Sequence, residues 1–82
     1  PAWRVSSRGR VSATLRGVVR EVSPDGSYLV QIETGAIVVA RASARVRARG
    51  IDILEGDEVR VEVSAADMTR GRITSTARRT TT

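Results

Sequence analysis

Short runs of valine and isoleucine, separated by glycine turns, constrain the fold of this chain more than any other feature. From Asp57 to Ser64 valine alternates with charged residues, so Val59, Val61 and Val63 share one face. This period of two predicts a strand that is buried on one side. The chain has 82 residues, 12 of them valine, a length that suits one domain and a residue type that favours strands. The sequence therefore predicts a single all-β domain.

Glycine and proline mark the turns between five expected strands, which cover residues 14–22, 27–33, 36–40, 57–64 and 71–76. In Pro24-Asp25-Gly26 the proline presets φ and the glycine accepts a positive φ, which is typical of a turn. Thr34-Gly35 predicts a tight hairpin. Gly17, inside the first strand, predicts a bulge or a sharp bend.

One short helix is expected between the third and fourth strands. Ser43 is its candidate N-cap, and Gly50 is the candidate left-handed residue at its end. A three-stranded meander, a short helix and two further strands follow the order of a five-stranded OB-fold β-barrel, in which closure removes exposed edges. We expect this domain to span residues 14–76, with a flexible basic arm over residues 1–13 and a disordered tail over residues 77–82.

The basic residues suggest a polyanionic partner. The chain carries a net charge of +5, and all 14 basic residues are arginine. Arg41, Arg45 and Arg49 have the spacing of one helix stripe, Arg47 extends it, and no acidic residue interrupts the run from Arg41 to Gly50. Because like charges at this spacing repel, an uncompensated stripe favours a nucleic-acid interface. A solvated helix face is the alternative interpretation.

Arg70-Gly71-Arg72 forms a second basic cluster, in the loop before the last strand or at the start of that strand. In an OB-fold this loop flanks the binding face, and arginine binds phosphate in a bidentate manner. An ordinary hairpin with exposed charges is the other interpretation. Tyr28 is a candidate for base stacking, but it shares strand parity with Val30 and Ile32, which favours a core or rim position.

Several classes of function are not expected. The chain has no cysteine or histidine, so we expect no disulfide, thiol nucleophile, catalytic site or cofactor. Asp52, Glu55, Asp57 and Glu58 do not have the spacing of a calcium loop, so no metal site is expected. The sequence contains no apolar run long enough to cross a membrane and no secretory signal, and we therefore expect a cytoplasmic protein.

Several motifs between Leu15 and Ile73 resemble a known family. They are Gly17-Val18-Val19, Pro24-Asp25-Gly26, Val30-Gln31-Ile32-Glu33-Thr34-Gly35, Ile51-Asp52-Ile53-Leu54-Glu55-Gly56-Asp57, Val59-Arg60-Val61-Glu62 and Asp67-Met68-Thr69-Arg70-Gly71-Arg72-Ile73. The last resembles an Asp-Leu-Thr-Arg-Gly-Arg-Ile hallmark. Together these motifs resemble bacterial translation initiation factor one.

This resemblance implies an OB-fold protein that is not an enzyme and that binds rRNA of the small ribosomal subunit at the decoding (A) site. There it would block premature tRNA entry and assist initiation factors two and three. The resemblance implies RNA contacts through Ser43, Arg45, Arg47, Arg70 and Arg72, and the charge pattern adds Arg41 and Arg49. We expect a monomer.

Several positions depart from the family pattern, among them the run Arg45-Val46-Arg47-Ala48-Arg49 and the basic arm. Asp52 replaces a usual arginine, Ala66 replaces an aromatic residue and Arg41 replaces a histidine. These departures leave two alternatives open. One is a paralogous or engineered OB-fold protein that binds single-stranded RNA or DNA non-specifically. The other is a scaffold for protein interactions without a nucleic-acid partner.

Overall fold

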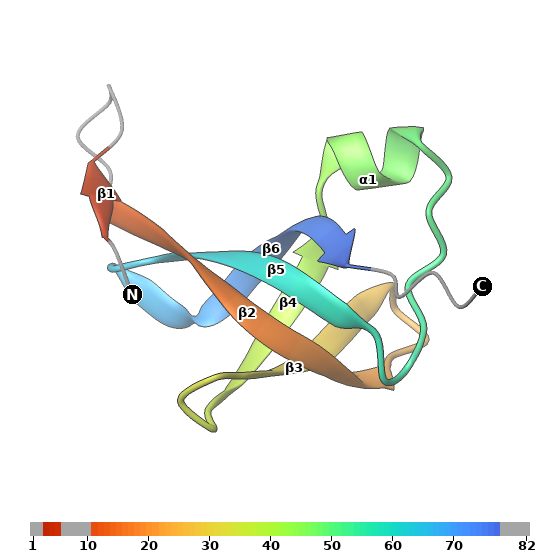
Figure 1. Ribbon diagram of the computed structural model, residues 1–82, viewed down its shortest axis with the longest axis horizontal. Helices are drawn as coiled ribbons and strands as arrows, with labels where there is room; N and C mark the ends of the chain where they lie inside the picture. The colour runs from red at the N-terminus through yellow and green to blue at the C-terminus, as the bar shows by residue number, and fades with distance from the viewer. Residues whose placement is uncertain (1–2, 6–10, 78–82) are drawn as a thin grey trace.

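A closed barrel of five strands forms the body of the computed structural model, which describes residues 3–5 and 11–77. A short helix, α1 (Ala44–Ala48), is part of the connection between the third and fourth barrel strands along the chain (Figure 1). A two-residue strand, β1 (Arg4–Val5), pairs with the start of the barrel. The barrel strands are β2 (Val11–Val22), β3 (Ser27–Ile32), β4 (Ile37–Ala42), β5 (Glu58–Ser64) and β6 (Asp67–Ala77).

The strands follow the order β2-β3-β4-β6-β5, and pairing of β5 with β2 closes the barrel. Neighbouring strands are antiparallel except β4 and β6, which are parallel. The strand β2 is long enough to pair with both β3 and β5. The predicted all-β barrel with one short helix is therefore confirmed.

The core is aliphatic and comes from the inward faces of all five strands. The alternation predicted for β5 is confirmed, because Val59, Val61 and Val63 are all buried. Val46 of α1 and Ile53 of the following loop close the core beyond the strands. The largest fully buried side chains are Leu15, Val19, Val30, Val38, Val46, Val59, Val61, Val63 and Ile73.

Gly17 lies where β2 has partners on both sides, Ile32 in β3 and Val59 in β5. A Cβ atom at this position would collide with Val30 Cγ1 and would lie 3.1 Å from the carbonyl oxygen of Gln31. Only glycine allows the strands to approach so closely. The bulge in this pairing falls between Val19 and Glu21, so Gly17 itself is not at the bulge. The sharp bend, the other feature expected at Gly17, stays a prediction.

Both predicted turns are present, with Gly26 and Gly35 at positive φ. Strand ends differ from the expected ones. β2 begins at Val11 rather than residue 14, and β6 begins at Asp67 rather than residue 71. Residues 4–5 and 11–13 of the expected arm thus lie in strands because they pair with each other and with β5. Trp3 of this arm is exposed, and Ala77 of the expected tail is the last residue of β6. Residues 1–2, 6–10 and 78–82 lie outside the described residues, so the domain division stays a prediction.

The only helix found in residues 3–5 and 11–77, α1, is far too short to span a lipid bilayer.

Candidate nucleic-acid interface

Local sequence determines where α1 begins and ends. Ser43 has an extended backbone, and its Oγ accepts a hydrogen bond from the backbone N–H of Val46 at 3.3 Å, as expected for an N-cap. Gly50 has a φ of 64°, the left-handed conformation predicted for it. Val46 is buried and fixes the helix on the barrel. Arg45, Arg47 and Arg49, named here the helix arginines, therefore remain exposed around it.

Arg41 does not belong to the helix. It lies in β4, before the Ser43 cap, on the outward face that alternates with buried Val38 and Ala40. The predicted stripe of Arg41, Arg45 and Arg49 on one helix is therefore wrong. The cap ends the strand conformation at Ser43, so the four-residue spacing between Arg41 and Arg45 crosses two kinds of structure.

Arg70 and Arg72 lie inside β6, so of the two expected positions the strand is correct and the loop is wrong. Gly71 between them faces the core, where an added Cβ would collide with Val61 Cγ1 and lie 3.1 Å from Val38 Cγ1. The two arginines therefore face outward. Parallel pairing places Arg72 beside Arg41 of β4. We name Arg41, Arg70 and Arg72 the strand arginines.

Two strand arginines share a hollow of about 420 Å³, whose lining residues are Asp25, Ser27, Val39, Arg41, Arg70 and Gly71. The Asp25 carboxylate Oδ1 accepts hydrogen bonds from the Ser27 hydroxyl at 2.6 Å and from the Ser27 backbone N–H at 3.0 Å. These bonds, the hydroxyl first, and the charge of Arg41 lower the pKa of Asp25. The hollow thus combines two guanidinium groups with one fixed carboxylate.

Carboxylates outside this hollow also lie beside Arg70 and Arg72. Arg72 Nη2 donates to Glu62 Oε1 at 2.6 Å. Asp67 Oδ1 accepts from the hydroxyl and the backbone N–H of Thr69, at 2.5 and 3.0 Å. These bonds, and more weakly the charge of Arg70, lower the pKa of Asp67. The strand arginines are therefore partly compensated within the chain.

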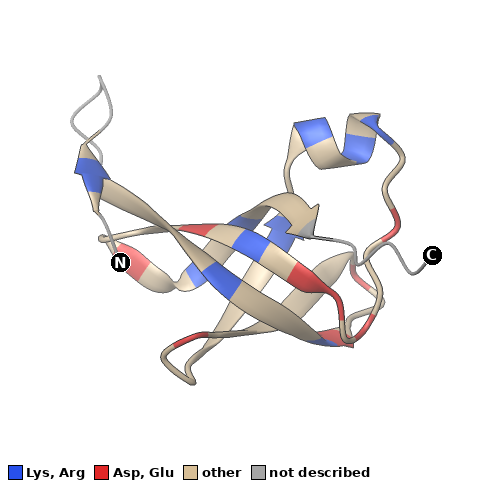
Figure 2. Ribbon diagram, viewed as in Figure 1, with Lys and Arg blue, Asp and Glu red and all other residues tan. Residues whose placement is uncertain are grey.

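The helix and strand arginines occupy neighbouring parts of the molecule. The helix α1 lies against β4 and β6, and the backbone N–H of Ser43 donates to the carbonyl of Ile73 in β6 at 2.9 Å. Figure 2 shows the basic segments of α1 beyond the ends of these two strands. We name the two groups together the basic surface. Guanidinium groups arranged in this way can bind several phosphates, each by paired hydrogen bonds.

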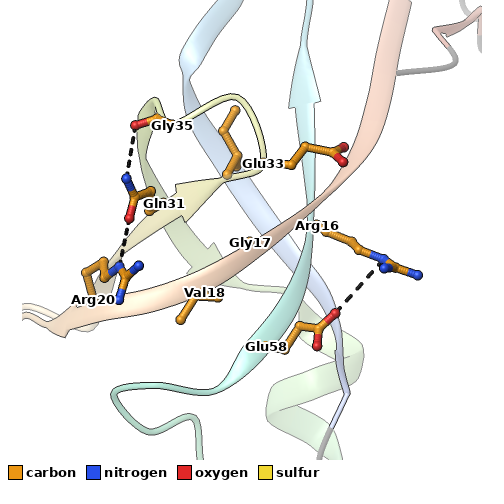
Figure 3. Close-up of a pocket in the computed structure, with 9 residues that line it drawn as sticks. Arg16, Gly17, Val18, Arg20, Gln31, Glu33, Gly35 and Glu58 are labelled. Carbon is orange, nitrogen blue, oxygen red and sulfur yellow. Dashed lines mark hydrogen bonds and ion pairs between the residues drawn. The ribbon is translucent and has the colours of Figure 1, made fainter.

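A second hollow, of about 340 Å³, lies where β2 passes between β3 and β5 (Figure 3). Its charged residues are Arg16, Arg20, Glu33 and Glu58. The Nε atom of Arg16 lies 4.0 Å from Glu58 Oε1, and Arg20 Nε donates to Gln31 Oε1 at 2.9 Å. Equal numbers of opposite charges line this hollow, so it is a poorer site for a polyanion than the basic surface.

The remaining candidates have ordinary structural positions. Tyr28 is half-buried and packs against the core from β3, next to Val22 and Ala40. Its position agrees with the core or rim interpretation, and base stacking stays a prediction. Asp57 Oδ2 accepts from the backbone N–H of Leu54 at 2.9 Å and so stabilises a turn. Within residues 3–5 and 11–77, no group of three acidic residues could hold a metal ion.

Sequence reasoning missed the lining residues Asp25, Ser27 and Val39. Asp25 belongs to a turn that was assigned only a structural role, Ser27 begins β3, and Val39 is an outward-facing valine in a short strand. The one available signal was the Asp-Gly-Ser sequence, because an aspartate followed two residues later by serine can bond its own turn.

Known proteins with similar sequences are translation initiation factors. The chain is 43% identical over 60 residues to translation initiation factor IF-1 of Oenococcus oeni, a match that covers 73% of the chain and 83% of that protein. It is 51% identical over 59 residues to an IF-1 of Bordetella avium, covering 72% of the chain and 67% of that protein. No family model matches the chain.

Solved structures agree with these relatives. The solution structure of translation initiation factor IF-1 from the Wolbachia endosymbiont of Brugia malayi matches with a TM-score of 0.69 and 28% identity, over 84% of this chain and 82% of that one. Crystalline YjeQ from Thermotoga maritima has a TM-score of 0.67 at 24% identity over 83% of this chain and 24% of that one, which shows a shared fold alone.

Sequence identity to the IF-1 relatives extends over nearly three quarters of the chain. The closed barrel with its short capped helix matches the fold of a solved IF-1 structure. The chain belongs to the translation initiation factor IF-1 family, whose members are non-enzymatic translation factors.

Proposed function

We propose that this chain binds rRNA of the small ribosomal subunit at the decoding (A) site through its basic surface. There it blocks premature tRNA entry and assists initiation factors two and three. The proposal rests on one observation above all, the grouping of arginines from β4, α1 and β6 at one part of the barrel. In this proposal the chain acts as a monomer in the cytoplasm, where ribosomal subunits are.

Phosphate contacts supply most of the affinity in this proposal. The proposed contacts are Ser43, Arg41, Arg45, Arg47, Arg49, Arg70 and Arg72. Ser43 also caps the helix that carries the helix arginines. The half-buried Tyr28 packs against the core, which leaves the guanidinium groups as the main ligands on this surface. Binding by phosphate neutralisation releases counterions, so the affinity falls steeply with salt.

Co-sedimentation with purified small ribosomal subunits tests the proposal. We expect the chain to pellet with subunits at low salt, to be released as salt is raised, and to be displaced by IF-1 of Oenococcus oeni. Failure to pellet with subunits at low salt would contradict the proposal. Pelleting that the relative does not displace would place the chain elsewhere on the subunit.

A comparison of the affinities for subunits and for unrelated single-stranded RNA tests the alternative of non-specific binding to single strands. Asp52 and Ala66 lie where the family usually has an arginine and an aromatic residue, so this chain lacks two side chains suited to RNA. Affinity for unrelated single-stranded RNA equal to that for subunits would favour the alternative. We expect a clear preference for the subunit.

A further inference from the structure

We infer that Glu62 is a specificity-determining residue of the basic surface: its carboxylate occupies Arg72 as an internal competitor of RNA phosphate. This inference rests on the proposed function, because it concerns one of the arginines proposed to contact RNA. Glu62 lies outside the set of proposed contacts and carries the charge that such a surface would be expected to avoid.

The geometry places Glu62 in direct competition for Arg72. The two residues are Cα partners on β5 and β6, and Arg72 Nη2 lies 2.6 Å from Glu62 Oε1. Arg72 is in turn the Cα partner of Arg41. One row across the outside of the barrel therefore carries Glu62, Arg72 and Arg41. Within this row, Glu62 draws Arg72 toward β5.

The contact is strong enough to compete and weak enough to be displaced. The side chains of Arg72 and Glu62 are 61% and 35% exposed, and ion pairs exposed to this degree are screened by water and salt. A carboxylate and a phosphate use the same guanidinium donors. RNA must therefore break the pair or accept a nearby negative charge, and both reduce the affinity.

The carboxylate also stands next to other basic groups. Glu62 and Arg4 of β1 line a common hollow of about 370 Å³. Arg60, two residues before Glu62 on the same strand, shares its face. A negative charge at this position thus weakens attraction of any polyanion to this side of the barrel. This penalty is a larger share of the total affinity for a partner that contacts few of the arginines, which favours a shaped rRNA site over a random strand.

A matched pair of variants separates this effect from a change in net charge. Glu62→Gln and Glu58→Gln each remove one negative charge from the same strand, and both carboxylates lie beside an arginine. Arg16, the partner of Glu58, lies outside the basic surface. Binding is measured by fluorescence anisotropy with two probes, purified small subunits and an unrelated single-stranded RNA, and melting temperatures of both variants are recorded.

We expect Glu62→Gln to tighten binding to the unrelated RNA by about two- to fivefold. Its effect on binding to subunits should be smaller. Glu58→Gln should change binding to either probe by less than Glu62→Gln does. The slope of log K against log salt for the single strand should steepen by about 0.7, because Arg72 then neutralises one more phosphate and releases the counterion of that phosphate. In an Arg72→Gln background, the gain from Glu62→Gln should disappear.

Equal responses of Glu62→Gln and Glu58→Gln would overturn the inference, because net charge alone would explain them. Weaker binding by Glu62→Gln would also overturn it, since Glu62 would then position Arg72 for RNA. If the wild-type chain does not bind subunits but the variants respond as expected on the single strand, the proposed function is contradicted and the inference about Glu62 stands. Absence of binding to both probes would overturn both.

Discussion

Asp25 shows how one turn residue acts on the basic surface. It accepts two hydrogen bonds from Ser27 and lies near Arg41, and its pKa is lowered, mainly by the Ser27 hydroxyl. A carboxyl group whose pKa is lower in the folded chain contributes stability above its unfolded pKa. That contribution is lost as pH falls through the folded value, below the ordinary pKa of about 3.9. The carboxylate therefore stays ionised beside Arg41 at neutral pH.

The pKa of Asp25 can be measured by NMR titration of its side chain. We expect Ser27→Ala to raise this pKa more than Arg41→Gln does, because the hydroxyl bond is the largest cause of the shift and Arg41 contributes less. The ranking is the test: a larger rise with Arg41→Gln would mean that the arginine charge, and not the turn, controls Asp25.

Gly71 is a residue whose role is steric. Its missing side chain allows β6 to approach Val61 and Val38, and it separates Arg70 from Arg72 so that both face outward. We expect Gly71→Ala to lower the free energy of unfolding by about 1–3 kcal/mol through overpacking. Urea unfolding measures this loss. Ser75→Ala, at an exposed position of the same strand, is the control and should change stability by less than about 0.5 kcal/mol. Equal stability of the two variants would contradict the packing argument.

The individual elements were predictable where local chemistry specifies them. Val59, Val61 and Val63 gave the period of β5, and Ser43 and Gly50 gave the helix ends. The assignment of Arg41 to the helix failed because charge spacing alone does not locate a cap. The parallel pairing of β4 with β6 joins residues about 30 positions apart, and no local pattern carries that information.

The helix is the element most exposed to a single substitution, because its five residues have one buried anchor, Val46. We expect Ser43→Ala to speed amide hydrogen exchange at Val46, whose N–H loses the Ser43 Oγ acceptor. At 3.3 Å this bond is long. The substitution should therefore lower the local stability of the helix by an amount near the low end for an N-cap, about 0.5 kcal/mol. Ser43→Thr, which keeps a hydroxyl, is the control.

Exchange in the barrel provides the comparison for this prediction. The amide of Val61 in β5 should exchange equally slowly in wild type and Ser43→Ala, because the core does not depend on the cap. Unchanged exchange at Val46 would show that the helix is held by Val46 packing alone. Faster exchange at both positions would mean that the cap supports the whole barrel.

At the scale of the whole molecule, the separation of charge matters more than its total. The net charge is +5. The hollow between β2, β3 and β5 is lined by equal numbers of opposite charges, while six arginines lie over β4, α1 and β6, where Asp25, Glu62 and Asp67 compensate only part of their charge. The composition predicted a polyanion partner, and only the fold could assign the arginines to a common surface. Aromatic residues make up 2% of the chain, so the proposed affinity for RNA rests mainly on phosphate contacts.

The central claim is that the basic surface binds the small ribosomal subunit. The most direct test compares the dissociation constants for purified subunits of two double variants, Arg45→Ala/Arg47→Ala and Arg16→Ala/Arg20→Ala. Each removes two exposed positive charges, the first from α1 and the second from the hollow in Figure 3. We predict that the first double variant binds about tenfold or more weakly, with a nearly unchanged melting temperature. Its slope of log K against log salt should decrease by the amount expected for the loss of roughly two phosphate contacts. The second should weaken binding by about twofold or less. Equal losses, or a larger loss in the second, would contradict the account.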